Sequence, residues 1–136
     1  GSFGTYSLGD DTSTSLLLAE LGMTRPAAQQ LPAQLGVMLP LSNEQLGEHG
    51  ADVLAMLGGH DSFFPVDALQ EIPTFDSAAD ASGVTVEVMG EMWTSSDPFA
   101  MWWVVADVAA IESGGAAGTF ADAGSRWAAY LAAITT

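Results

Sequence analysis

The sequence predicts an α/β fold, a three-layer α/β/α lobe around a small, mostly parallel sheet. Residues 53–57 form a short, almost wholly apolar run, which is typical of a strand covered on both faces. Residues 84–88 alternate valine with polar residues, which predicts a strand with one apolar face. Residues 98–112 are apolar on most sides and predict a well-buried helix. Two strands among several helices favour one lobe of a layered α/β structure.

The N-terminal part predicts one helix with clear ends. Residues 12–21 are rich in good helix formers, and Gly22 ends the helix because glycine enters the left-handed conformation at little cost. Either Asp11 or Thr12 can cap its first turn. Residues 3–6 fit the end of a short strand that precedes this helix.

A long connection is predicted to follow, over residues 23–40. A continuous helix is prevented by the prolines at positions 26, 32 and 40. Connections longer than about 12 to 15 residues in a compact domain are usually functional or disordered. This segment is therefore a candidate source of functional residues.

A short helix then leads into the strand at 53–57. Ser42 and Gln45 have the spacing of a capping box, in which each side chain satisfies a free backbone N–H of the other residue. Gly50 stops the helix. Glu44 lies in the first turn, where the helix dipole favours a carboxylate, and is expected to point to solvent.

The strand at 53–57 is followed by a turn at residues 58–61, on the carboxyl side where ligands bind in open α/β sheets. Residues 66–71 predict a short helix that Pro73 breaks, and residues 74–81 predict one more helical turn. A last helix is predicted over residues 120–134, where Trp127, Tyr130, Leu131 and Ile134 follow helical spacing.

The buried helix at 98–112 is preceded by a loop over residues 90–97. Pro98 suits the first helical position, with Ser96 or Asp97 as the cap. The loop carries Trp93, whose neighbours include threonine and two serines. These polar neighbours favour a partly exposed loop, and a place in the core is the alternative for the tryptophan.

The charge of the chain excludes whole classes of partner. Among 136 residues there are 17 acidic residues, two arginines and no lysine, which gives a formal charge of -15. Nucleic-acid binding needs clustered cations, so it is not expected, and an anionic membrane surface is disfavoured. The charge suits a cationic partner or a high-salt setting. Because cysteine is absent, the chain forms neither disulfides nor thiolate metal sites.

Catalysis and metal binding have weak support in the sequence. His49, His60, Asp52 and Asp61 are the residues that tempt a metal-site interpretation, but they lack ligand spacing such as His-x-x-x-His. There is no Ser-His-Asp pattern and no glycine-rich phosphate loop. We therefore expect no enzyme and no resident metal. A small hydrolase would need convergent titratable groups around His60.

The order of these features resembles the C-terminal lobe of ABC-transporter substrate-binding proteins for iron-siderophores, haem or cobalamin (periplasmic binding protein, class III). The resemblance covers roughly residues 5–112. It is carried by a helix ending in Leu-Gly, Arg-Pro-x-x-Gln at 25–29, Ser-x-Glu-Gln-Leu at 42–46, Ala-Asp-Val-Leu at 51–54, a Pro-aromatic pair near 73–75, Val-x-Val at 84–88 and the Trp93 loop. The N-terminal lobe and its connecting helix are missing from the sequence, and the tail after Gly114 is longer than in that family.

This resemblance implies a solute-binding function without catalysis. The ligand, an iron-siderophore, haem or a related chelate with no covalent cofactor, would lie between two lobes. Trp93 would contact the ligand, with contributions from Met38 in the 35–40 loop and from His60. Arg25 is a further ligand candidate, for which pairing with a nearby carboxylate is the structural alternative. Glu44 would dock onto arginines of the permease.

The resemblance also sets expectations for domain organisation and location. Gly1-Ser2 is typical of a cloning scar, and residues 3–136 form the single lobe. The whole protein is expected on the outer side of the cell membrane, anchored by lipid, with an N-terminal lobe as its partner. A lobe without that partner exposes an apolar face or a sheet edge, which a dimer would cover. The alternative is a non-enzymatic α/β interaction domain, unrelated to transport, with a complete sheet.

Overall fold

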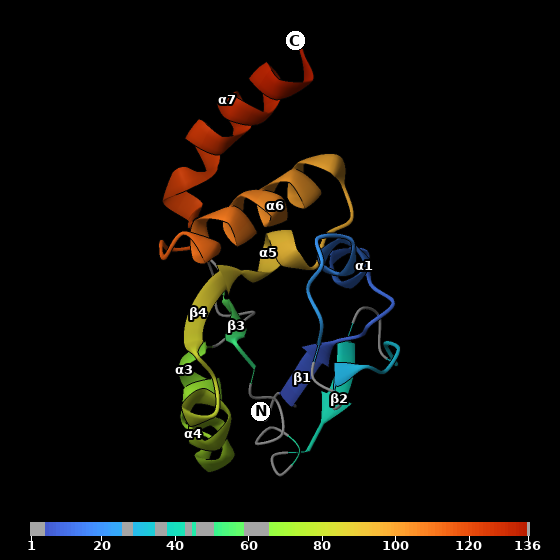
Figure 1. Cartoon of the computed structure of the whole chain (residues 1–136), viewed down its shortest axis with the longest axis vertical. Coiled ribbons are helices and arrows are strands. Elements are labelled where there is room, and N and C mark those ends of the chain that lie inside the picture. Colours follow the sequence, from blue (N-terminus) through green and yellow to red (C-terminus); the bar gives the residue numbers. More distant parts are fainter. Residues whose placement is uncertain are drawn as a thin grey trace.

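The structure is a computed structural model that describes residues 5–25, 29–34, 38–42, 45, 51–58 and 66–135. It confirms a small α/β domain. Its strands are β1 (Thr5–Leu8), β2 (Met38–Leu41), β3 (Val53–Gly58) and β4 (Val84–Met89). Its helices are α1 (Ser13–Glu20), α3 (Val66–Gln70), α4 (Pro73–Asp80), α5 (Gly90–Trp93), α6 (Pro98–Glu112) and α7 (Ala123–Ile134), with a 3₁₀ turn at Phe120–Asp122 (Figure 1).

The strands form two separate pairs. β3 and β4 are parallel, with Val53 opposite Val84 and Gly58 opposite Met89, as the two predicted strands require. β1 and β2 are antiparallel, and Tyr6 stands opposite Pro40. β2 lies within the segment that the sequence predicts as a connection, so this prediction is wrong for residues 38–40. A proline is compatible with an edge strand, which needs no donor on its outer side.

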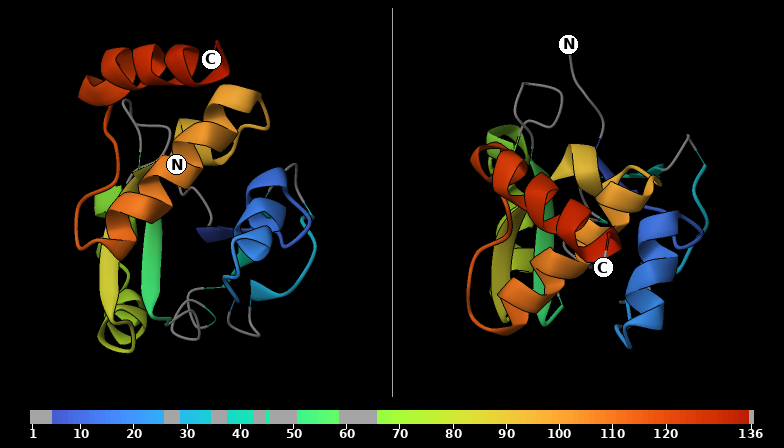
Figure 2. Two further views of the ribbon diagram at one scale, coloured as in Figure 1. Left: turned by 45° about the horizontal axis from the view of Figure 1, so that its top comes forward. Right: turned by 90° about the horizontal axis from the view of Figure 1, so that it is seen from above.

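The β3–β4 pair is covered by helices on both faces. Leu54 and Met56 of β3 pack with Phe75 of α4, in a cluster that also includes residues of α3. Ala55 and Leu57 point to the opposite face and pack with the cluster around Trp103 of α6. The α3–α4 layer therefore lies on one side and the α5–α6 layer on the other (Figures 1 and 2). β3 is almost wholly apolar because helices cover both of its faces, as the sequence predicts.

Helix ends follow the signals in the sequence. Thr12 caps α1, since its Oγ1 accepts from the Ser15 N–H at 3.1 Å, and Gly22 follows with φ +85°. Asp97 caps α6 by accepting from the Ala100 N–H at 2.9 Å. Gly114, with φ +81°, follows its end. These boundaries are set locally, by side chains that satisfy free backbone groups.

The predicted capping box is present. Ser42 donates its N–H to Gln45 Oε1 at 2.8 Å, and Gln45 donates its N–H to Ser42 Oγ at 3.2 Å. Glu44, which stands between them in the sequence, lies outside the described residues.

Two predictions about local structure are corrected. Pro73 begins α4, an eight-residue helix, rather than only ending the helix before it. The reason is that proline lacks the N–H that would be unsatisfied at the first helical position. The predicted loop at 90–97 contains the helical turn α5.

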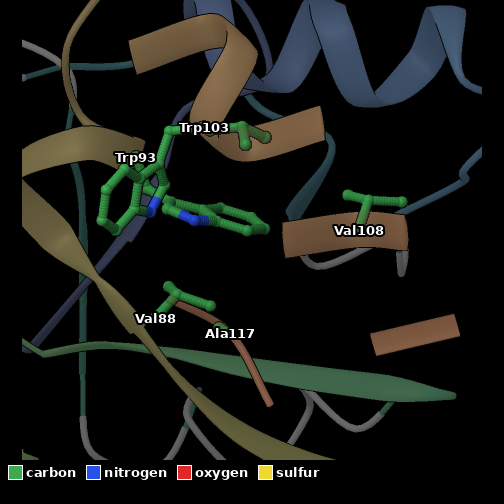
Figure 3. Packing of buried hydrophobic residues seen from close by; sticks show 6 residues of the cluster. Val88, Trp93, Trp103, Val108 and Ala117 are labelled. Atoms are coloured by element: carbon green, nitrogen blue, oxygen red, sulfur yellow. The ribbon is translucent and has the colours of Figure 1, made fainter. Parts of the chain in front are cut away.

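The main core lies between α6 and the β3–β4 pair. It consists of buried side chains from four segments: Val88, Trp93, Trp103, Val104, Val108 and Ala117. Figure 3 shows the indoles of Trp93 and Trp103 next to each other, with the other labelled side chains around them. Trp103 is fully buried, so α6 is fixed to the sheet by its largest side chain.

Helix α7 follows the predicted position but is mostly exposed. Its apolar stripe packs through Trp127 and Tyr130 on Phe99 of α6, at ring-centroid distances of 5.0 and 5.3 Å. Trp127 is still 47% exposed and Ile134 58%. Figure 1 shows the helix projecting beyond α6 to the chain end. The stripe is therefore an apolar surface as well as a packing face.

The turn before α7 is held by a carboxylate. Thr119 donates both its N–H and its Oγ1–H to Asp122 Oδ2, at 2.7 and 3.1 Å. The hydrogen bond from the Thr119 backbone N–H lowers the pKa of Asp122 most, followed by the bond from the Thr119 hydroxyl and, to a smaller extent, by the charge of Arg126.

Within the described parts of the chain, no helix has both the length and the apolar character needed to cross a membrane.

Candidate functional site

A pocket of about 270 Å³ opens between the start of α1 and the segment that follows α5. Polar side chains dominate its lining, which consists of Asp11, Thr12, Ser13, Thr14, Ala33, Trp93, Thr94, Ser95 and Ser96. Trp93 ends α5, and the segment after it is the remainder of the loop predicted over residues 90–97. The structure therefore places this loop against the first helix, about 80 residues away in the chain.

The two walls of the pocket are joined by a buried hydrogen bond. Thr14, in the first turn of α1, is 1% exposed and donates its Oγ1–H to the carbonyl oxygen of Trp93. Because an unsatisfied buried hydroxyl is costly, this bond holds α1 in register with the end of α5. The pocket is thus bounded by elements that cannot shift independently.

A third wall comes from the segment at residues 29–34. Asp11 accepts the Ala33 N–H at 2.8 Å, and the Asp10 N–H donates to the Leu31 carbonyl at 2.8 Å. Gly9 allows this close approach, since a Cβ there would lie 2.3 Å from the Ala33 nitrogen. Any larger residue at position 9 would push this wall away from the start of α1.

Arg25 supports the pocket from behind and is not part of its lining. Its Nη1 donates to Ser15 Oγ at 2.9 Å, and its Nε and Nη2 donate to Gln29 Oε1 at 3.2 and 3.0 Å. Burial lowers the pKa of the guanidinium, and the charge of Asp10 acts in the opposite direction. Among the described residues its contacts are hydrogen bonds to neutral groups. Pairing with a carboxylate, for which Asp10 is the candidate, and ligand contact both stay predictions.

Trp93 lies in the pocket wall but is not partly exposed. It is 6% exposed, and its Nε1–H donates to Asp107 Oδ2 at 2.8 Å. The loop around it is partly exposed as predicted, at residues 94–97, but the tryptophan itself is a core residue. Thr94 and Ser95 donate their hydroxyl protons to carbonyl oxygens of the preceding helical turn, at 2.7 and 2.8 Å.

Asp107 is the structural residue that the sequence analysis did not single out. It is fully buried and accepts from Trp93 Nε1, from the Gly118 N–H at 2.7 Å and from Arg126 Nη1 at 2.7 Å. Arg126 also lies over the Trp103 ring, 4.3 Å from its centroid. One carboxylate thus joins α5, α6, the following loop and α7. Its role could have been suspected from the sequence, because it is a single aspartate at helical spacing from the buried apolar residues of α6.

The other candidate site residues are only partly placed. Met38 begins β2, next to the end of β1, and its side chain is not described. His60 and Glu44 lie outside the described residues, so their predicted roles stay predictions. Within the described ranges, no group of three or more histidine, aspartate or glutamate side chains is arranged to hold a metal ion.

The lining of the pocket is suited to binding. It offers six hydroxyl groups, one carboxylate and the backbone of a helix start, and it includes neither a histidine nor a cation. Such a lining is able to form hydrogen bonds to a bound molecule.

Comparison of the chain with protein-family models, with curated proteins and with solved structures gives no match.

Proposed function

We propose that the chain is the solute-binding lobe of a system that imports an iron-siderophore, or a related metal chelate, through an ABC transporter. The observation that supports this proposal is the composition of the pocket. Its lining includes Trp93 and the three residues after it, in the loop from which the resemblance implies ligand contact. The start of α1 forms the opposite wall.

In this proposal the lobe contributes one half of the binding site. A second lobe closes over the ligand, so the isolated chain binds more weakly than the whole protein because half of the enclosing surface is missing. The buried Trp93 acts as a rigid part of the wall, and the exposed Ser13 and Ser96 are the side chains best placed to touch a ligand.

The test is to fill the pocket without disturbing the core. Ser96→Trp places a bulky side chain at an exposed pocket position and is expected to weaken binding of the cognate chelate at least about ten-fold, a loss of about 1.4 kcal/mol. Ser77→Trp is the matched control, since Ser77 is exposed on α4, on the other side of the sheet. Calorimetric titrations with ferric siderophores, haem and cobalamin measure the effect. Equal affinities of the two variants, or no binding by the unaltered chain, would contradict the proposal.

Glu44 is proposed to be the contact with the permease. Its sequence neighbours Ser42 and Gln45 form the reciprocal capping bonds that the sequence predicts for the start of a helix. A carboxylate in the first turn of such a helix, as predicted for Glu44, would form strong charge-assisted hydrogen bonds with arginine. Reversing its charge with Glu44→Arg is expected to reduce ligand-stimulated ATP hydrolysis by the reconstituted transporter about ten-fold, with ligand affinity unchanged.

The control for charge reversal is Glu112→Arg. Glu112 is exposed at the end of α6, where a cation is favoured by the helix dipole. If both variants reduce ATP hydrolysis equally, the loss reflects overall charge and Glu44 has no special role.

The exposed apolar stripe of α7 bears on both functions. Trp127, Leu131 and Ile134 form the kind of apolar face that a lobe without its partner exposes, and they also suit the partner-binding surface of an interaction domain unrelated to transport. In that case none of the chelates binds, and Leu131→Ser alters association of the chain with a partner protein. The calorimetric titration above separates the two functions.

A further inference from the structure

Four of the six hydroxyl groups in the pocket lining donate their protons to acceptors within the protein. Thr14 donates its proton to the Trp93 carbonyl, and Thr94 and Ser95 donate theirs to backbone carbonyls of α5. The proton of Thr12 goes to the Ser15 hydroxyl at 2.9 Å. A hydroxyl has one proton and two lone pairs, so what these four groups retain is lone pairs. A bound molecule must therefore supply donors to them.

The helix starts beside the pocket already have negative charges. Asp11 directly precedes the Thr12 cap of α1 and lines the pocket. Asp97, next to the lining residue Ser96, caps α6 through its own carboxylate. The partial positive charge of a helix N-terminus normally favours an anion, and here side chains of the chain itself provide it.

No lysine or arginine lines the pocket. The chain contains two arginines and no lysine. Arg25 is engaged by Ser15 and Gln29, and Arg126 is paired with Asp107. The net charge of -15 adds a repulsive field for any anion that approaches.

We infer that the ligand of this pocket is an uncharged or cationic molecule rich in hydrogen-bond donors, such as a metal chelate that carries ammonium or amide N–H groups, and that anionic chelates are rejected. This inference rests on the proposed function and adds the chemical class of its ligand. The acceptor-rich lining selects for donors, and the Asp11 carboxylate gives a further advantage to positive charge.

The first experiment compares three gallium(III) complexes, which are diamagnetic, in ¹H–¹⁵N correlation spectra of the ¹⁵N-labelled chain. The first is a linear trihydroxamate with a pendant ammonium, the second is the same complex with its amine acetylated, and the third is a trianionic triscatecholate. We expect the cationic complex to bind most tightly and the trianion at least ten-fold more weakly. The largest shifts are expected at the amides of Ser13, Thr94 and Ser96.

The second experiment removes the charge of the pocket. Asp11→Asn keeps an oxygen to accept the Ala33 N–H and is expected to weaken the cationic complex about two- to five-fold, with little effect on its acetylated form. Asp76→Asn changes the net charge equally at an exposed position on α4 and is expected to leave both affinities unchanged. The spectra themselves show that each variant is folded.

The outcomes separate this inference from the function on which it rests. Preferential binding of the trianion overturns the inference and leaves chelate binding standing. Binding of a metal-free polyamine at the same amides, weakened by Asp11→Asn, in the absence of any chelate binding supports the inference and overturns the proposed function. Equal effects of Asp11→Asn and Asp76→Asn overturn the role of Asp11. Absence of binding by every probe overturns both proposals.

Discussion

Replacing Asp107 with alanine is expected to lower the free energy of unfolding by about 3–5 kcal/mol, the range for removing one partner of a buried ion pair. The substitution leaves three donors without their acceptor: Trp93 Nε1, the Gly118 N–H and the largely buried guanidinium of Arg126. Urea denaturation measures the effect, provided that the slope with denaturant stays unchanged. Most small domains have total stabilities of about 5–15 kcal/mol, so this one change removes a large part.

Controls show how much of this effect is the ion pair. In Arg126→Met the carboxylate keeps its two N–H donors, and the loss is expected to be smaller. The double variant Asp107→Ala/Arg126→Met should lose less than the sum of the single variants, because each already removes the same contact. A loss below about 1 kcal/mol for Asp107→Ala would mean that the buried carboxylate is replaceable.

The second large effect is expected at Trp93. Trp93→Ala should lower the free energy of unfolding by about 3–5 kcal/mol, since it removes a large buried side chain from the main core. The substitution also removes the Nε1–H group that donates a hydrogen bond to Asp107. The same urea experiment applies, with near-ultraviolet circular dichroism to report on aromatic packing.

Trp93→Phe separates packing from hydrogen bonding. Phenylalanine keeps most of the apolar contact but has no N–H for Asp107 Oδ2, so a smaller loss of about 1–3 kcal/mol is expected. If alanine and phenylalanine cost the same, packing contributes little at this position. In either case, loss of ligand binding in Trp93→Ala reports on folding as well as on contact, so Ser96 is the better position for testing the pocket.

Helix ends and the parallel strands could be predicted from the sequence because their causes are local. Thr12, Asp97 and Gly114 act on backbone groups within one turn of the chain. The β3–β4 pair follows from two apolar patterns of the right length, separated by helices. Such signals can be recognised without knowledge of the rest of the structure.

The antiparallel strand pair and the burial of Trp93 depend on distant residues. Residues of β2 pair with residues of β1 that lie 30 to 36 positions earlier, and the prolines around β2 make its segment look like a connection. Trp93 is buried because Asp107 accepts its N–H and Thr14 bonds to its carbonyl, and neither partner is near it in sequence. The pocket depends on the same long-range contacts, so only its Trp93 loop could be anticipated.

Because Arg126 is paired with Asp107, cleavage of the chain by trypsin measures how often α7 detaches from the rest of the structure. Trypsin cleaves after lysine or arginine and acts poorly where proline follows, so the Arg25–Pro26 bond is resistant and the bond after Arg126 is the single good target. That bond lies in the first turn of α7, and its arginine is held by Asp107. When opening is fast relative to cleavage, the proteolysis rate tracks the population in which α7 has detached.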